Sequence, residues 1–350
     1  MSELTALTAA EVAATADWIE SVQLPNGMIP WFPGGHADPW NHTEAAMALV
    51  RAGNRPAAER AYDWLAANQL ADGSWCAYYL ADGVEEPRRD PNVVAYVATG
   101  VWWHFLETKD HALLEAMWPV VDAAFSFVLR MQLASGAFAW SLGPDGVLSE
   151  GALLTGSSSI LHSLRAAVAI AAELGEERPE WELAAGRAAH AIAHRPSAFL
   201  AKDRWAMDWY YPVLSGAVGG DSGRTRIEAR WDTFVLEGVG VRCVADQPWV
   251  TAAETAECVM ALEALGMSER AAQLLGWTRH LRDDEGAYWT GCVHPQCVRY
   301  PGGERSTYTA AAVVMADHVV HGSGPTAGLF RGEMLPPVMD FAALSPAGEG

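Results

Sequence analysis

The sequence predicts an all-α protein, an (α/α)6 toroid built from six helical hairpins. Two observations lead to this fold class. Apolar residues recur with helical spacing along most of the chain, and a QxxxGxW-like phrase is repeated several times between helical segments. A single helical hairpin cannot bury its apolar face alone, so repeated hairpins must pack against one another. A closed ring lets every hairpin do so.

The repeat is clearest in QLPNGMIPW from Gln23, QLADGSW from Gln69 and QLASGAFAW from Gln132. The stretch DDEGAYW at 283–289 is a weaker copy, and DRWAMDW at 203–209 is a degenerate one. Each copy ends a helical segment, turns through Gly or a polar pair, and leads to a Trp. The hairpin loops should therefore converge at one end of the ring.

Periodicity and helix-end signals predict about twelve helices. They are expected at 8–22, 40–52, 55–68, 91–107, 111–132, 155–174, 179–194, 208–217, 226–237, 251–265, 268–281 and 307–321. Segment 55–68 is amphipathic and charged, as an outer helix should be, whereas 307–316 is small and apolar, as a crowded inner helix should be. We expect one toroid domain over 1–329 and a surface tail over 330–350.

Composition excludes several classes of function. The chain has 350 residues, is 51% hydrophobic and carries a net charge of −20, so a large core is expected and a nucleic-acid partner is not. Its apolar stretches are interrupted before the roughly 20 residues of a membrane span, and its N-terminus lacks the features of a signal peptide. Five sparse cysteines predict a cytoplasmic protein with reduced thiols. The oligomeric state is left open.

The mouth of such a toroid is the expected site of function. Inner helices point their N-termini, with the positive ends of their dipoles, into this shared mouth. Among the 16 Trp residues, several stand with polar residues in predicted loops, where their rings suit a sugar or a polyene chain. These are Trp31, Trp40, Trp209, Trp249 and Trp289.

The segment DPWNHTE at 38–44 enters this mouth. Asp38 precedes a proline, which is a helix-start signal, and Asp90 repeats that pattern, where capping is sufficient explanation. Capping alone does not require the Trp40, Asn41 and His42 that follow Asp38. Asp38 is therefore a catalytic candidate as well as a cap, and the three residues after it are candidates for substrate binding.

Glu44 lies one turn further along a helix that is otherwise apolar. A buried carboxylate is costly unless it is paired or has a chemical role, so Glu44 is also a catalytic candidate. The alternative is an ion pair or a hydrogen bond, for instance with His42.

A second segment, 246–257, echoes the first with Pro-Trp followed by Glu-x-x-Met-Ala-Leu. Glu257 is the repeat equivalent of Glu44. Glu254 and Thr251 have the spacing of a capping box, which is the structural alternative for Glu254. Glu254 and Glu257 share one helix face, and two acids there exceed what capping needs.

Four further residues complete the expected binding set in this half of the chain. Arg242 should pair with Asp246 or Glu254, and Trp249 and Trp289 offer aromatic faces near the mouth. Asp246 itself is counted among the candidates for substrate binding.

A third segment places Asp208 among the aromatics Trp209 and Tyr210. In a typical sugar subsite, a carboxylate accepts hydrogen bonds from hydroxyls while neighbouring aromatic rings stack on the pyranose faces. A helix cap surrounded by core aromatics explains the same pattern.

Other chemistries have weaker support in the sequence. Cys292, His294 and Cys297 loosely resemble zinc ligands but lack a second half-site, so no metal is expected. The Ser-rich stretch 155–159 has no GxSxG elbow. No phosphate-binding Gly loop occurs, and no cofactor is expected.

The repeat resembles that of squalene and hopene cyclases and of protein prenyltransferase β-subunits, which implies the toroid fold. The chain lacks the DxDD motif and the Asp-x-Cys pair of those enzymes. Over nearly its whole length it is similar to an actinobacterial family, loosely labelled prenyltransferase-like, that includes methylmannose polysaccharide hydrolases. The resemblance is carried by DPWNHTEAAMAL, LLTGSSSI, MDWYYPVLSGA, RCVADQPWVTAAETAE and YWTG.

This resemblance implies an endo-acting α-1,4-mannanase whose substrate is a partly O-methylated polysaccharide. Glycoside hydrolysis uses two carboxyl groups, one of them protonated near neutral pH. We expect Asp38 or Glu44 on one side and Glu254 or Glu257 on the other, and favour Asp38 with Glu254 because both lie nearest the helix N-termini. Analogy with glucoamylase-like toroids favours inversion. The alternatives are a terpenoid cyclase or prenyl-transfer enzyme and a non-catalytic glycan-binding toroid.

Overall fold

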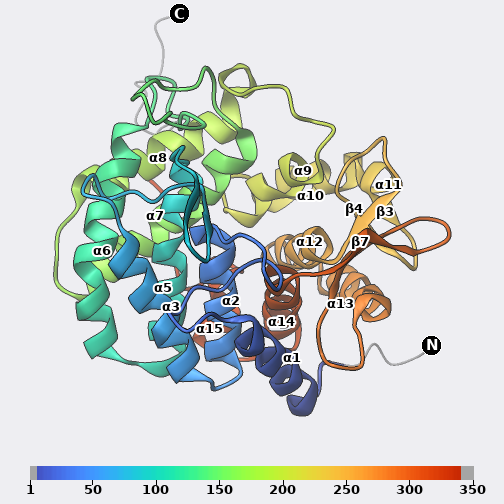
Figure 1. Cartoon of the computed structure of the whole chain (residues 1–350). Coiled ribbons are helices and arrows are strands. Elements are labelled where there is room, and N and C mark those ends of the chain that lie inside the picture. Colours follow the sequence, from blue (N-terminus) through green and yellow to red (C-terminus); the bar gives the residue numbers. More distant parts are fainter. Residues whose placement is uncertain (1–5, 340–350) are drawn as a thin grey trace, which may run out of the picture.

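The computed structural model describes residues 6–339, and helices arranged in two concentric rings dominate it (Figure 1). Each inner helix packs against the next one along the chain, and the last packs against the first, so the ring is closed. The inner helices are α2 (Pro39–Arg51), α5 (Val97–Thr108), α7 (Leu154–Glu173), α9 (Ala206–Leu214), α12 (Ala252–Ala264) and α14 (Thr307–His321).

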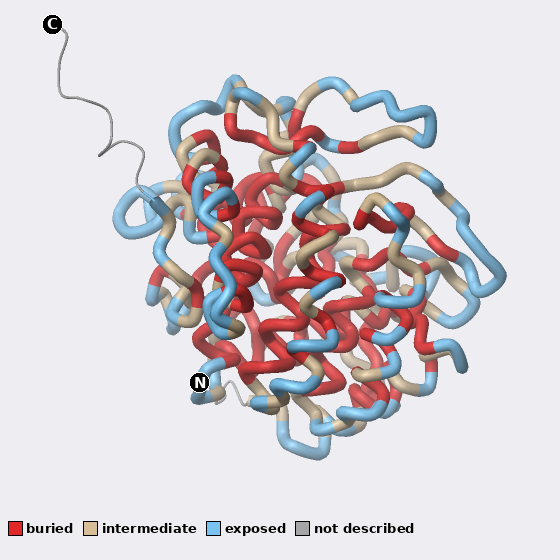
Figure 2. Tube along the Cα trace, turned by 90° about the vertical axis from the view of Figure 1, so that its left-hand side faces the viewer, coloured by how far each residue is buried: buried red, intermediate tan, exposed pale blue. Residues whose placement is uncertain are grey.

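The outer helices alternate with the inner ones along the chain. They are α1 (Ala9–Val22), α3 (Arg55–Asn68), α6 (His111–Arg130), α8 (Pro179–His194), α10 (Gly220–Ala229) and α13 (Ser268–Trp277). In Figure 1, α1, α6 and α13 lie at the periphery, while α2, α12 and α14 lie nearer the centre. Figure 2 shows buried chain through the middle and exposed chain at the outer loops. The predicted (α/α)6 toroid is confirmed.

The repeated glutamine joins neighbouring hairpins. The side-chain amide of Gln69 donates one hydrogen bond to the carbonyl oxygen of Gly73 in its own turn, at 3.0 Å, and a second to that of Val120 on α6, at 2.9 Å. The other two copies make the same pair of bonds: Gln23 to Gly27 and Ala57, and Gln132 to Gly136 and Ala184. Each repeat therefore fastens one hairpin to the outer helix of the next.

The glycine of the repeat is required by both conformation and space. Gly73 has φ +87°, and a Cβ there would lie 2.0 Å from the carbonyl oxygen of Ala123 on α6. Only glycine adopts this backbone without strain and lets the turn approach the helix so closely.

The weak copy at 283–289 closes the ring. Gly286 has φ +90° and packs against the backbone of α1, where the Thr15 hydroxyl donates to its carbonyl oxygen at 2.8 Å. Arg282 stands where the other copies have Gln, and it donates to the carbonyl oxygen of Glu11 on α1 at 3.1 Å. The last hairpin is thus held to the first.

Two small antiparallel sheets, which the sequence did not predict, line the loop end of the ring. The strands of one are β1 (Tyr78–Leu80) and β2 (Gly83–Glu86). The other has the order β3-β4-β5-β6-β7, with β3 (Val235–Leu236), β4 (Gly240–Arg242), β5 (Trp249–Thr251), β6 (Trp289–Val293) and β7 (Val298–Arg305). Strand β5 runs directly into α12 and β7 leads into α14, so this sheet fixes where both helices begin.

The helix predicted at 226–237 is wrong in its second half. Helix α10 ends at Ala229, the short α11 (Trp231–Phe234) follows, and the chain then turns into β3. Val235 and Leu236 pair with β4 instead of continuing the helix. The predicted helix 91–107 is divided at Tyr96 into α4 (Pro91–Ala95) and α5.

The remaining short helices are α15 (Pro325–Leu329), η1 (Pro196–Ala198) and η2 (Thr278–Leu281). Part of the predicted tail, residues 340–350, lies outside the described residues. In the described part, Phe330 and Leu335 are buried against the toroid, so the start of this segment packs into the fold. The domain limit at residue 329 stays a prediction.

One described helix, α6, is long and apolar enough to cross a membrane by length and composition, although no apolar stretch of that length was expected. Its apolar residues include Leu114, Met117 and Phe125, which are buried inside the toroid. Packing in the outer ring accounts for this composition.

We expect Gln69→Ala to lower the free energy of unfolding by about 1–3 kcal/mol, because it removes the two hydrogen bonds that join the Gly73 turn to α6. Urea unfolding followed by circular dichroism measures this. The matched control is Gln296→Ala in an exposed loop, for which we expect a change below about 0.5 kcal/mol. Equal effects of the two substitutions would contradict the clamping role of the repeat.

Candidate active site

Asp38 caps α2 at the mouth and is held by four N–H groups. Its Oδ1 accepts from the backbone N–H of Trp40 at 2.8 Å and of Asn41 at 3.0 Å. Its Oδ2 accepts from the indole Nε1 of Trp31 and the side-chain Nδ2 of Asn41, both at 2.6 Å. Burial raises the pKa of Asp38, and these donors act to lower it. Because all four partners donate, the site stabilises the ionised carboxylate and fixes its orientation.

Glu44 and Glu257 meet below the mouth, inside the ring. Both line a small cavity together with Tyr96, Tyr211 and His162. The cavity offers a volume of about 20 Å³ to the centres of water molecules. One water needs about 10–15 Å³ by this measure, so the cavity has space for a single water. Both glutamates are buried, and a cavity of this size cannot hold a sugar between them in the observed structure.

The charges of these two acids are strongly coupled. The hydroxyls of Tyr210 and Tyr211 donate to the two oxygens of Glu257, the second at 2.5 Å. Burial nevertheless raises the pKa of Glu257 to about 8. Burial, together with the negative charges of Glu257 and Asp38, raises the pKa of Glu44 well above its ordinary value. The protonated form of Glu44 is therefore favoured.

Glu254 differs from the other three acids because it is partly exposed. It lies in the first turn of α12, but the side chain of Thr251 does not cap this helix, so the predicted capping box is not formed. Burial of the carboxyl raises the pKa of Glu254, which the neighbouring Thr251 hydroxyl opposes. Glu254 is thus an accessible carboxyl group at the mouth whose protonated form is favoured.

Aromatic rings surround the approach to Asp38 and Glu254. The Trp31 ring makes edge contacts with Tyr308 of α14 at 5.1 Å and with Tyr78 of β1 at 5.9 Å. Tyr308 follows the start of α14, the inner helix between α2 and α12. The two tyrosines were missed, because each stands alone in the sequence and reaches the mouth only through the fold.

Trp40 extends this aromatic surface toward α7. Its ring stacks on Tyr96 with centroids 4.2 Å apart, and its Nε1 donates to Ser159 Oγ at 3.3 Å. Its partial exposure agrees with the predicted binding position. Asn41 instead orients Asp38 through its amide.

The structure places three predicted binding residues in the core. His42 is fully buried, and its ring nitrogens contact the backbone N–H of Ile29 and the carbonyl oxygen of Ala61. Trp209 is 2% exposed and stacks on Phe234 at 5.2 Å. Tyr210 is buried against Glu257. Their aromatic and polar side chains stabilise the ring, and none of the three presents a surface to a sugar here.

The expected pairing of Arg242 is also corrected. Arg242 donates to the carbonyl oxygen of Ala245 at 3.3 Å, whereas Asp246 pairs with Arg204 at 2.8 Å on the exposed surface. Trp249 stacks on Tyr300 at 5.0 Å, and Trp289 lies against Arg299 and Arg305. Trp249 and Trp289 are partly exposed on the sheet that carries α12 and α14.

The cysteine and histidine cluster shows no metal geometry. Cys292 is buried on β6, Cys297 stands at the turn before β7, and contact with the Cys297 thiol adds to burial in raising the pKa of Cys292 to about 12. Among the described residues, His294, Cys292 and Cys297 do not form a group whose ligand atoms lie close enough to hold one metal ion.

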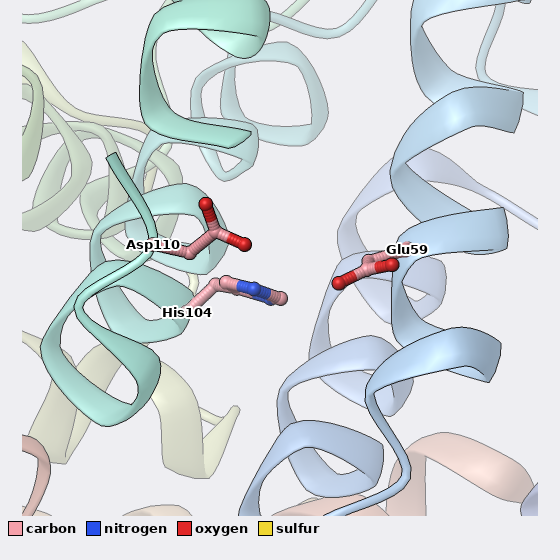
Figure 3. Close-up of side chains that lie close together, drawn as sticks. All are labelled: Glu59, His104 and Asp110. Carbon is pink, nitrogen blue, oxygen red and sulfur yellow. The ribbon is translucent and has the colours of Figure 1, made fainter. Parts of the chain in front are cut away.

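A different cluster, Glu59, His104 and Asp110, brings its ligand atoms within 4.8 Å of one another. Figure 3 shows Glu59 of α3 pointing toward His104 and Asp110 across the gap between the helices. Arg55 forms ion pairs with both carboxylates, with Glu59 at 3.3 Å. Because this guanidinium already neutralises them, the cluster is an ion-pair network between α3, α5 and α6, at the end of α5 opposite the mouth.

A comparison with curated proteins identifies the family. The enzyme "MMP endo-(1,4)-3-O-methyl-alpha-D-mannosidase" of Mycolicibacterium hassiacum is 50% identical over 330 residues, which cover 94% of this chain and 91% of the enzyme. The chain belongs to the family of this mannosidase. The expected membership of a toroidal glycoside hydrolase family is therefore confirmed. No model of a known protein family matches the chain.

Solved structures similar to this mannosidase-family chain share its fold. A glycosidase in complex with glucose superposes with a TM-score of 0.71, at 16% identity over 94% of this chain and 98% of that one. A D-mannose isomerase gives 0.69 at 11% identity, covering 88% of this chain and 96% of that one. Toroids with different sugar chemistries thus share this architecture, and function has to be argued from the site.

We expect Glu257→Gln to change how stability depends on pH. The pKa of Glu257 lies near 8 in the folded protein and at its ordinary 4.5 when unfolded, so the folded state holds the proton more tightly. The contribution of Glu257 to stability is fully present below the pKa of the unfolded state. It is lost as the pH rises through the pKa of the folded state. The free energy of unfolding of the wild type should therefore fall more steeply over this window, by up to about 1.4 kcal/mol per pH unit.

Urea unfolding of both proteins at several pH values between about 5 and 8 measures the difference. The exposed Glu269→Gln is the control and should keep the wild-type slope. Identical slopes for Glu257→Gln and wild type would show that Glu257 titrates normally.

Proposed function

We propose that the protein is an endo-acting glycoside hydrolase that cleaves α-(1,4) linkages in a 3-O-methylated mannan, with Asp38 and Glu254 as its reacting acids. The observation that carries this assignment is the partly exposed Glu254 beside the start of α14, with Asp38 on the other side of that helix, at the start of α2. The name of the mannosidase relative supports the substrate.

Position in the ring, rather than burial alone, separates the four acids, since Asp38 is itself only 3% exposed but lies at the N-terminus of α2. Glu44 and Glu257 face a cavity that holds one water, so they cannot touch a glycosidic oxygen without a large rearrangement. They form a pair of buried acids below the mouth, and burial favours the protonated form of both. Asp38 and Glu254 remain as the pair at the mouth, among the rings of Trp31, Tyr78 and Tyr308.

The two acids are suited to different roles. Glu254 has a raised pKa, which keeps a proton available for the leaving-group oxygen as a general acid. The four donors around Asp38 oppose the effect of burial on its pKa and favour the carboxylate form, which suits a general base that orients a water. This division of roles leads to inversion at the anomeric carbon, and retention would require one carboxylate to attack that carbon itself.

The aromatic mouth matches a methylated sugar. Ring faces stack on pyranoses, and a methyl ether replaces a hydroxyl donor with an apolar group that an aromatic surface can bury. We also propose that the enzyme acts in the cytoplasm, in keeping with its five unpaired cysteines.

We expect Glu254→Gln and Asp38→Asn each to lower kcat by about 10²–10⁴-fold with a folded protein, since each removes one proton-transfer group. In the wild type, activity should fall at high pH as Glu254 loses its proton. Reducing-end release from α-(1,4)-linked 3-O-methylmannose oligosaccharides measures the rate, and proton NMR of the first product gives its anomer, expected to be inverted.

The exposed Glu269→Gln is the matched control and should keep the wild-type rate. Full activity of Glu254→Gln or Asp38→Asn would refute the assigned pair. Absence of cleavage by the wild type would instead favour a toroid that binds the glycan without cutting it.

A further inference from the structure

A pocket opens at the starts of α4, α7 and α9, away from the proposed reacting pair. Its volume is about 290 Å³, near the lower end, about 300 Å³, for pockets that hold small molecules. In the order of the inner ring, α7 and α9 lie between α5 and α12, whereas Asp38 and Glu254 flank α14. The pocket therefore occupies the opposite side of the same mouth.

Asp208 provides an acceptor in this pocket. Its Oδ1 accepts from the backbone N–H of Thr155 at 3.1 Å and from the Thr155 hydroxyl at 2.5 Å. The other oxygen, Oδ2, takes no hydrogen bond from a described residue, although Asp208 is only 7% exposed. Burial raises the pKa of Asp208. A hydroxyl of a ligand would supply the donor that this oxygen lacks.

Asn92 and Asp90 lie on the neighbouring side of the pocket. The Asn92 Oδ1 atom is buried and has no hydrogen-bond partner among the described residues. Asp90 caps α4 through the backbone N–H of Asn92 at 2.9 Å and lies 3.5 Å from Arg88. The pocket thus presents two unpartnered acceptor atoms, from Asp208 and Asn92, and both suit hydroxyl donors.

Two tryptophans form its outer wall. Trp140 and Trp205 are 39% and 43% exposed, and both line the pocket. The lining is otherwise mainly apolar, with Phe138 and Ile160 among its residues. Exposed tryptophan rings beside hydroxyl acceptors are the combination that binds a pyranose through its face and its edge.

We propose that this pocket is a distal subsite that binds a 3-O-methylated mannose unit of the polysaccharide. Hydroxyls of the sugar donate to Asp208 Oδ2 and Asn92 Oδ1, its ring stacks on Trp205 or Trp140, and its methyl group contacts the apolar lining. The proposal rests on the proposed function and adds to it a position for substrate recognition. A glycan that reaches from this subsite to Asp38 and Glu254 spans the mouth, as internal cleavage requires.

The probe is methyl 3-O-methyl-α-mannopyranoside, a monosaccharide that cannot span the distal subsite and the reacting pair at once. It is titrated into full-length protein, and saturation-transfer NMR measures its binding. Trp205→Ala should weaken binding about tenfold, and Asp208→Asn should weaken it as well because the amide presents one acceptor fewer. Methyl α-mannopyranoside should bind about fourfold more weakly, since it lacks the buried methyl group.

The control is Trp118→Ala, in which the ring is removed from the outer helix α6, where it packs beside Arg178. It should bind the probe as the wild type does. On the polysaccharide, Trp205→Ala should raise KM with little change in kcat, which separates a lost binding contact from a damaged reacting pair.

Unchanged affinity in both Trp205→Ala and Asp208→Asn, or no binding by the wild type at tens of millimolar probe, would overturn the proposal. Neither result would affect the cleavage assay, so the subsite can fail while the proposed function stands. Conversely, wild-type protein that binds the probe through Trp205 but cuts no mannan would keep the pocket and reject the hydrolase.

Discussion

The hydrogen bonds of the repeated glutamine are the constraint on which the rest of the structure depends. Each Gln amide holds its own glycine turn and the next outer helix together, so it sets the distance between hairpins. The closing copy replaces Gln with Arg282 and reaches α1. These clamps hold four of the six junctions between neighbouring outer helices in the same orientation, in keeping with inner helices that begin at one end of the ring. The mouth is a consequence of this geometry.

The closed ring also explains the electrostatics of the four acids. Tight packing of small residues leaves Glu44 and Glu257 with space for one water between them, and burial raises the pKa of each. The negative charge of Asp38 contributes to the raised pKa of Glu44, and that of Glu254 contributes to the raised pKa of Glu257. The site therefore has two levels, with two buried acids below and an accessible carboxyl group above. Aromatic rings surround the opening.

Much of the fold could be predicted from the sequence, because the repeat and the helical periodicity are local signals. The limits of 55–68, 179–194 and 307–321 agree with α3, α8 and α14. The five-stranded sheet could not be predicted, since its strands are as short as two residues and pair across distant segments. The helix predicted at 226–237 was wrong in its second half for the same reason, because β3 forms there.

The candidate site was predictable in part. The acids of α2 and α12 stood out because carboxylates are rare on apolar helices. Trp209 was misassigned, because an aromatic residue beside an acid looks the same in a core as in a subsite. Tyr78, Tyr308 and the pocket around Trp205 were missed, since they are assembled from segments that carry no shared motif. Which of the four acids lie at the mouth and which face the small cavity below it depends on the folded ring, which no local signal in the sequence reveals.

The most direct test of the central claim is a crystal structure of Glu254→Gln with a bound 3-O-methylmannose oligosaccharide. We predict that the side-chain amide at position 254 lies within hydrogen-bond distance of a glycosidic oxygen. Asp38 should face the anomeric carbon from the opposite side, through a water. An oligosaccharide whose glycosidic bond lies between Asp90 and Asp208, far from residue 254, would contradict the account.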